Sequence, residues 1–449
     1  MTFAYEHNCE KLLSVARRLA AVHIVDLVKT DEFRRLSLEI VSQLLALDEL
    51  AVSREEDVWD VVMQWIEYDE ENRKSRFEEL SKVVRFPLIV EREFLLSHPV
   101  VSVNESYRSL VLEKSSEPRP TRRLGNKVLL AVGGVVSTES KGFFPNDVTA
   151  TKTVEYYDHL SNVWKELPSL NEARYSPGVV TLDNSVYAIG GWRNRSVERY
   201  DSTEGCWMSD VSPMQFNRTG KGVVVYENRI YAMGSNRGEN EFTLCEQYNS
   251  ATNSWTSLQS LSKPVLVEGT LVSNDHIYVL GSNLIGLVGE NLDVFKYDPF
   301  ADCWLDVPFC SQGYDENDDE FVFQFLCADR NCLHLRREIL SWPGTRPFEH
   351  LTLDVRNGQL TRYKVGDCPP FLDTLRRFYD NAYCLYNEKV YSVGGVMRGA
   401  CHDASDVQTF FWYDMSTEVA QYVEGPRLMK KRSRCGVAAI DRRLTFNVC

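Results

Sequence analysis

Short apolar segments that end in glycine recur along the chain from about residue 127 onward. Val186–Gly191 is one such segment, and related segments begin at Ile230, Ile277 and Val390. An earlier copy covers residues 130–134. Short apolar runs bounded by turn residues are typical of buried β-strands, and glycine allows the positive φ of a tight turn after the strand. The pattern therefore predicts a repeated β-unit.

A second marker follows most of these segments. It is a tyrosine with a tryptophan seven residues later, and both side chains offer a large apolar face with a polar tip. Such residues suit packing between neighbouring units. The four pairs are Tyr157 and Trp164, Tyr200 and Trp207, Tyr248 and Trp255, and Tyr297 and Trp304.

The spacing of the repeat predicts the architecture. The first glycines lie at positions 133, 190, 234 and 281, and the next clear copy, Gly394, follows about two periods later. A degenerate unit is therefore expected between them, roughly at 328–386. Periods of about 50 residues with four strands each are typical of kelch blades. The stretch 127–449 resembles a six-bladed kelch β-propeller, with Gly436–Ile440 as the innermost strand of the first blade.

Two units depart from the repeat. The fifth unit has residues 333–337 where the glycine pair is expected, and the sixth has Ala420 in the tryptophan position. Looser packing is expected on that side of the propeller.

Residues 1–114 follow a different, helical period. Apolar residues recur at helical spacing in three stretches, which predicts an all-α domain whose apolar stripes form a core. A proline-containing linker is expected at 115–126 and the propeller at 127–449. The stripes comprise Leu12, Leu13, Ala16 and Leu19; Phe33, Leu36, Ile40, Leu44 and Leu47; and Val58, Val61, Val62, Trp65 and Ile66.

The order of motifs in this helical part resembles the BACK domain of BTB-BACK-Kelch (kelch-like) proteins. The motifs are residues 44–50, 55–59, 64–66 and 84–88, and residues 3–13 resemble the junction between BTB and BACK. The resemblance implies a multidomain protein with an N-terminal BACK domain and a kelch propeller. The BTB domain that should precede residue 1 is expected to be missing, through a truncated gene model or a genuine short form.

Composition narrows the function classes. The chain has 449 residues, 43% of them hydrophobic and 25% charged, with a net charge of −14. This excess of negative charge disfavours nucleic acids and anionic membranes as partners. We find no run long enough for a membrane span and no signal peptide. The sequence therefore predicts a cytoplasmic protein, with cytoskeletal association or a nuclear location as alternatives.

Cysteine, histidine and motif patterns do not favour catalysis. The 12 cysteines are scattered without a Cys-x-x-Cys pair, so neither a metal site nor a cofactor is predicted. Cys435 lies beside Arg434 and near Arg432, but a buried strand cysteine is the favoured interpretation over a redox sensor. No phosphate loop or hydrolase motif is present. A non-enzymatic protein is predicted.

Partner contacts are predicted in two sets of loops: those after the glycine pairs and those leading into the next innermost strand. By resemblance to kelch-like substrate receptors, these loops form the ligand face. Arginine and tyrosine are favoured in interface hot spots, and arginines suit an acidic peptide, although the acidic run 315–320 would repel one. The predicted contacts are Arg174, Tyr175, Arg193, Asn194, Arg195, Asn217, Arg218, Asn236, Arg237, Asn283, Tyr314, Arg398, Arg432 and Arg434.

The family resemblance implies a substrate-recognition adaptor of a cullin-RING ubiquitin ligase. The propeller would bind the protein substrate, and the BACK side would contact the cullin. Two alternatives stay open: an actin-binding or scaffolding kelch protein without a role in ubiquitination, and a chain without BTB that antagonises full-length receptors.

Overall fold

The computed structural model describes most of the chain in two compact units, Met1–Lys127 and Val128–Cys449. Each unit is considered by itself. The described residues are 5, 7, 9–47, 50–52, 55–89, 92–117, 127–137, 148–158, 162–183, 185–234, 243–282, 292–305, 307, 321–329, 331–339, 349–364, 378–379, 382–386, 389–398, 404–406, 410–414 and 422–441.

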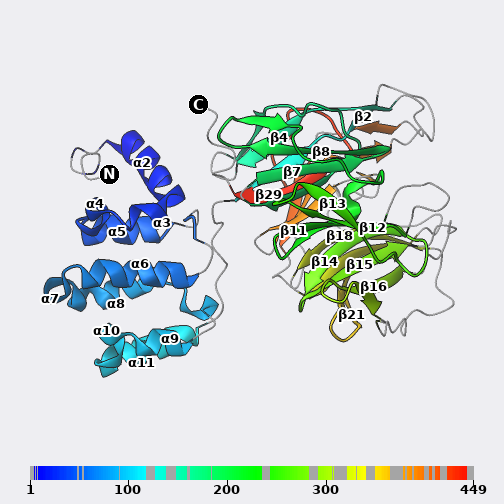
Figure 1. The fold of residues 1–449 in the computed structure, drawn as a ribbon. Helices are drawn as coiled ribbons and strands as arrows, with labels where there is room; N and C mark the ends of the chain where they lie inside the picture. The colour runs from blue at the N-terminus through cyan, green and yellow to red at the C-terminus, as the bar shows by residue number, and fades with distance from the viewer. Residues whose placement is uncertain are drawn as a thin grey trace. The chain divides into compact units, whose positions relative to one another are not determined.

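The first unit is entirely helical in its described part (Figure 1). Its longest helices are α2, α6 and α11, with shorter helices and 3-10 turns between them. The helices are α2 (Glu10–Val22), α3 (Ile24–Leu27), α4 (Asp31–Arg34), α5 (Leu38–Leu45), α6 (Glu55–Glu67), α7 (Glu70–Arg73), α8 (Phe77–Leu80), α9 (Arg92–Ser97), α10 (Pro99–Ser102) and α11 (Glu105–Ser115), with 3-10 turns η1 (Lys74–Arg76), η2 (Ser81–Val83) and η3 (Phe86–Leu88).

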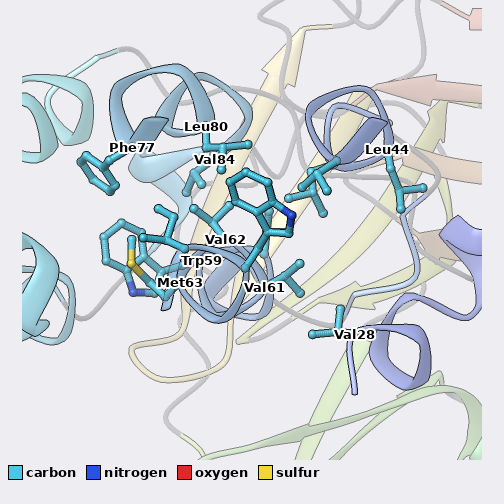
Figure 2. Packing of buried hydrophobic residues seen from close by; sticks show 14 of the residues in the cluster. Val28, Leu44, Trp59, Val61, Val62, Met63, Phe77, Leu80 and Val84 are labelled. Atoms are coloured by element: carbon cyan, nitrogen blue, oxygen red, sulfur yellow. The ribbon is translucent and has the colours of Figure 1, made fainter. Parts of the chain in front are cut away.

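Helix α6 supplies the centre of the helical core. Trp59 is fully buried, and its ring meets Phe77 and Phe86 edge-on with centroids 6.0 and 5.8 Å away. Figure 2 shows Trp59 and Val62 of α6 among the apolar side chains of the segment that follows. Burying a large apolar side chain contributes roughly 1.5–3 kcal/mol. The α6 stripe predicted from the sequence is therefore the main packing face of this unit.

Two predicted stripes differ in the structure. The stripe from Phe33 to Leu47 is divided between α4 and α5, because Ser37 caps the start of α5 by accepting a hydrogen bond from the Ile40 amide. On α2, Leu12 and Leu19 do not join the core. They are 50% and 61% exposed, and Val15 between them is 57% exposed.

In its described residues the second unit contains six four-stranded antiparallel sheets, which confirms the predicted kelch propeller class. Each sheet is one blade, named blade 1 to blade 6. From the innermost strand outward they are blade 1, β29 (Gly436–Asp441), β1 (Lys127–Val132), β4 (Val154–Asp158) and β5 (Val163–Leu167); blade 2, β6 (Gly178–Leu182), β7 (Ser185–Gly191), β8 (Asn194–Asp201) and β9 (Cys206–Met208); blade 3, β10 (Val223–Tyr226), β11 (Arg229–Met233), β12 (Cys245–Asn249) and β13 (Ser254–Leu258); blade 4, β14 (Leu266–Ser273), β15 (His276–Ser282), β16 (Leu292–Asp298) and β17 (Cys303–Leu305); blade 5, β18 (Phe321–Asp329), β19 (Cys332–Ile339), β20 (Glu349–Asp354) and β21 (Gln359–Lys364); and blade 6, β23 (Ala382–Tyr386), β24 (Lys389–Val393), β27 (Phe410–Asp414) and β28 (Tyr422–Glu424).

Several short strands and one 3-10 turn lie in the loops of these blades. They are the hairpin of β2 (Val135–Ser137) and β3 (Val148–Ala150), the three-stranded sheet of β22 (Phe378–Tyr379), β25 (Val396–Arg398) and β26 (Ala404–Asp406), and the 3-10 turn η4 (Gly220–Gly222).

The innermost strands form a ring. In order, β29, β6, β10, β14, β18 and β23 each contact the next, and β23 contacts β29. The C-terminal β29, red in Figure 1, lies beside β1 in blade 1, so the two ends of the propeller sequence share one sheet. This arrangement removes an open sheet edge. The degenerate fifth unit forms a complete blade that starts at Phe321, before the boundary expected near residue 328.

The tyrosine–tryptophan pairs pack between blades. In blade 1, Tyr157 and Trp164 lie opposite each other on β4 and β5, with ring centroids 5.7 Å apart. Both rings contact Phe410 of blade 6, at 4.6 and 5.1 Å. The pairs of blades 2, 3 and 4 pack in the same way against the blade before them. Ala420, the sixth tryptophan position, lies outside the described residues.

Candidate partner-binding face of the propeller

Both predicted loop sets lie at one edge of the blades. In blade 2 the start of β6 pairs with the end of β7, since Gly178 lies opposite Ile189. The loop leading into the innermost strand and the loop following the second strand therefore emerge together. The same register brings the start of β23 beside the end of β24 in blade 6. We call this side of the propeller the loop edge.

Glycines let neighbouring blades approach closely at the loop edge. Gly190 and Gly191 have φ of 60° and 122°, in the region that side chains disfavour. A Cβ on Gly190 would lie 2.6 Å from the carbonyl oxygen of Arg218 in the next blade. The Gly191 amide donates to that same carbonyl oxygen at 2.9 Å. The glycine pair thus joins one blade to the loop of the next.

Three of the predicted contact arginines form buried ion pairs inside the blades. The pairs are Arg174 with Glu198 in blade 2, at 3.0 Å; Arg218 with Glu246 in blade 3, at 2.6 Å; and Arg432 with Glu155 in blade 1. All six side chains are almost completely buried.

The surrounding backbone supplies further hydrogen bonds to these ion pairs. In blade 3, Arg218 Nη1 donates to the carbonyl oxygens of Ala232, Gly234 and Leu244. Glu246 accepts from the Gln215 and Phe216 amides at 2.9 and 3.4 Å. Buried charges persist only when paired and hydrogen-bonded in this way. Each pair therefore fixes the loop that leads into the next innermost strand.

The burial of these arginines corrects the sequence prediction. Arg174, Arg218 and Arg432 were expected to face a partner, but their exposed fractions are 0%, 1% and 0%. Each guanidinium is occupied by a glutamate and by backbone carbonyls of its own blade. These three residues shape the loop edge and do not present charge on it.

Blade 4 replaces the ion pair with apolar side chains. Val265 stands four residues before Gly269, as Arg218 stands four before Gly222, and Phe295 stands two before Tyr297, as Glu246 stands two before Tyr248. Val265 and Phe295 belong to one core cluster and are 1% and 8% exposed. Both positions of the pair are apolar here, so neither leaves an unpaired charge.

Four other side chains form a row across the loops of blades 1 and 2, in which Tyr175 is half-buried and the other three are exposed. The Arg434 guanidinium lies over the Tyr175 ring, with Cζ 5.1 Å from its centroid. The Tyr175 and Trp192 rings are 6.0 Å apart, and Arg193 Cζ lies 5.9 Å from the Trp192 centroid. These distances fall within the range of cation–π attraction. We call Arg434, Tyr175, Trp192 and Arg193 the cation–aromatic row.

Trp192 is a member of this row that sequence reasoning did not select. Its side chain is 38% exposed, unlike the tryptophans of the four repeated pairs. The signal available in the sequence was its position directly after the glycine pair, outside the tyrosine–tryptophan spacing.

The other predicted residues take different places. Asn194 stabilises its own turn, because its Oδ1 accepts from the Ser196 amide at 2.7 Å and its Nδ2 donates to Glu172 at 3.2 Å. Arg195 and Asn217 are exposed at the loop edge, and Arg398 is the last residue of β25. Asn236, Arg237, Asn283 and Tyr314 lie outside the described residues, as does the acidic run 315–320.

Charge near the row is mixed. Hydrogen bonds from Ser196 and Asn194 lower the pKa of Glu172, so this carboxylate is charged at neutral pH. Partial desolvation by neighbouring groups lowers the pKa of the Arg434 guanidinium from its ordinary value, and arginine stays protonated at neutral pH. Glu172 lies 3.9 Å from the buried Arg174 guanidinium. The negative charge is thus placed beside the blade 2 ion pair.

Within the described ranges, no cluster of three histidine, cysteine or acidic residues could hold a metal ion. None of the helices described here is long and apolar enough to cross a membrane.

Comparison with known proteins agrees with this architecture. The BACK family (BTB And C-terminal Kelch) matches residues 1–98, and the Kelch motif matches residues 173–214 and 217–262. The chain is thus a kelch-propeller protein with a BACK domain.

The chain is also similar to several curated kelch-like proteins. Kelch-like protein 3 of Danio rerio is 31% identical over 211 residues, which cover 42% of this chain and 33% of that protein. Kelch-like protein 17 of Mus musculus is 32% identical over 201 residues, covering 40% and 30%. Kelch-like protein 7 of Rattus norvegicus is 27% identical over 347 residues, covering 61% and 56%. The chain is thus similar to kelch-like proteins, and it spans about a third to a half of the length of these relatives.

Proposed function

We propose that this chain is a substrate-recognition adaptor of a cullin-RING ubiquitin ligase, and a binding protein rather than an enzyme. The observation that carries the proposal is the combination of a BACK match with a kelch propeller in one chain. We assign residues 1–114 to the BACK domain, 115–126 to a linker and 127–449 to the propeller. The loop edge binds the protein substrate, and the helical unit binds the cullin.

Helix α2 offers a surface for the cullin. Leu12, Val15 and Leu19 follow helical spacing and are all at least half exposed. Apolar side chains scattered singly on a surface need no explanation, but three on one helical face favour a protein contact. This stripe supports the assignment of the cullin contact to α2.

The test is a calorimetric titration of the purified chain with the N-terminal part of a cullin. We expect binding with a Kd in the micromolar range or tighter, and at least about tenfold weaker binding by Val15→Glu with Leu19→Glu. Val103→Glu is the matched control, because Val103 is 73% exposed elsewhere in the helical unit. Its binding should be unchanged.

Absence of cullin binding by the intact chain would count against the adaptor function. Co-sedimentation of the same chain with actin filaments would then favour the scaffolding alternative. Binding that Val103→Glu weakens as much as the α2 variants would remove α2 as the contact.

A further inference from the structure

The cation–aromatic row has the geometry of a peptide-binding site. It joins three loops: Arg434 precedes β29, Tyr175 precedes β6, and Trp192 and Arg193 follow β7. Two neighbouring rings therefore form an apolar platform with a guanidinium at each end. The row lies at the boundary between blades 1 and 2.

The backbone holds the row in place. The Ser176 amide donates to the Arg434 carbonyl oxygen at 2.9 Å, and the Trp192 amide donates to the Tyr175 carbonyl oxygen at 2.7 Å. The buried Arg174 and Arg432, each close in sequence to a row member, anchor two of the loops. A preorganised site loses little conformational entropy when a ligand binds.

Both arginines of the row occupy a backbone conformation that favours glycine. Arg193 has φ of 56° and Arg434 has φ of 49°. This conformation is strained for a residue that has a side chain, and residues held in such conformations cluster at functional sites. Arginine at both ends of the row is therefore not a consequence of backbone preference.

The chemistry of the row selects a ligand class. Guanidinium groups form bidentate hydrogen bonds with carboxylates, and aromatic faces pack against apolar side chains such as proline or leucine. The chain as a whole has a net charge of −14, so an acidic ligand needs local positive charge. Glu172 is 55% exposed, but its carboxylate already has partners in blade 2, since it accepts hydrogen bonds from Ser196 and Asn194 and lies 3.9 Å from the Arg174 guanidinium.

We propose that the cation–aromatic row binds an extended peptide in which an apolar residue is flanked on both sides by aspartate or glutamate. This inference rests on the proposed function, since the peptide would belong to the protein substrate. According to this proposal, the peptide binds mainly to blades 1 and 2. Arg174, Arg218 and Arg432 make no direct contact with it.

The test is selection of a random nine-residue peptide library against the purified full chain, followed by fluorescence anisotropy of the selected peptides. We expect a consensus of acidic residues on both sides of an apolar residue, and an affinity that falls as salt is raised. Arg434→Gln and Trp192→Ala should each weaken binding about tenfold or more.

Arg229→Gln is the matched control, because Arg229 is an exposed arginine at the start of β11, at the opposite end of the strand from the loop edge. It should bind the selected peptides with unchanged affinity. Melting temperatures of the variants separate lost binding from lost folding. If Trp192→Ala has a lowered melting temperature, the binding affinity of Arg434→Gln alone tests the inference.

A neutral or basic consensus, no enrichment, or binding that Arg434→Gln leaves intact would each overturn the inference. The cullin titration is independent of these outcomes, because it measures a contact of the helical unit. Failure of the peptide assignment with intact cullin binding would therefore leave the adaptor function standing.

Discussion

Arg218 and Glu246 form an ion pair at 2.6 Å in which both side chains are buried in blade 3. The pair joins the loop before β10 to the third strand of the same blade. Blades 1 and 2 each contain an equivalent buried arginine–glutamate pair between the same loop and the third strand. The loop edge of these blades is thus built on three equivalent buried ion pairs, which contribute to the stability of the propeller.

Removal of one partner should be strongly destabilising. Arg218→Val leaves the Glu246 carboxyl group buried without its ion-pair partner, and breaking a buried pair in this way typically costs about 3–5 kcal/mol. The double variant Arg218→Val with Glu246→Phe copies Val265 and Phe295 of blade 4, so it should be more stable than either single variant. Urea unfolding followed by tryptophan fluorescence measures the difference. A double variant as unstable as the sum of the singles would contradict this account.

Burial also changes the expected effect of alanine at Arg218. As the surface contact that the sequence predicts, Arg218 could be replaced by alanine without a change in the melting temperature. The burial of Arg218 means that its loss lowers the melting temperature.

The turn at Asn253 should be sensitive to backbone conformation. Asn253 has φ of 47°, and its Oδ1 accepts from the Tyr248 hydroxyl at 2.9 Å. Blade 2 carries Gly205 at the equivalent position, with φ of 65°. Both Asn253→Ala and Asn253→Gly lose the hydrogen bonds, but only alanine keeps the strain, so the alanine variant should be less stable by about 1 kcal/mol. Thermal unfolding of the two variants side by side tests this. Equal stability would show that the backbone is relaxed.

His334 should make the propeller sensitive to acid. Burial lowers its pKa from 6.5 to about 4, so the folded state holds it neutral. Between those pH values the unfolded chain binds a proton that the folded chain does not, so stability is full above pH 6.5 and falls as the pH drops towards 4, by about 3 kcal/mol at most. Denaturant unfolding of His334→Leu over this range should show a flatter dependence on pH. His23→Gln, an exposed histidine of the helical unit, should follow the parent.

Cys435 should be chemically inert in the folded protein. It is 7% exposed, and burial raises the pKa of its thiol to about 11, which disfavours the reactive thiolate despite the two neighbouring arginines. Iodoacetamide at neutral pH, followed by mass spectrometry, should modify the partly exposed Cys206 and Cys303 before Cys435. Unfolding in denaturant should remove the difference. Rapid modification of Cys435 in the native state would instead favour a redox role.

The repeat was readable from the sequence because its markers have fixed local geometry. Tyr200 and Trp207 lie opposite each other on adjacent strands, and a spacing of seven residues suits two strands joined by a tight turn. The glycine pair was readable for the same reason. The fifth blade was harder to place because it lacks these markers, although its strands β18 and β19 pair as in the other blades.

The exposure of single residues could not be predicted from the sequence pattern. The apolar period of α2 predicted a buried stripe, yet Leu12 and Leu19 are exposed, because periodicity identifies an apolar face without showing what covers it. Trp192 resembles any other tryptophan in sequence, and its place beside Tyr175 depends on a loop from before β6.

The sequence by itself determined the repeat, the propeller class and the loops that carry arginine, since these depend on local spacing and turn chemistry. Only the tertiary structure decided what each arginine does. Arg432 and Arg434 are two residues apart, but Arg432 is buried against Glu155, 277 residues away in the chain, whereas Arg434 is exposed over Tyr175. The physical reason is that a guanidinium is stable in the core only where a carboxylate and backbone carbonyls meet it, and the fold supplies these partners from distant strands.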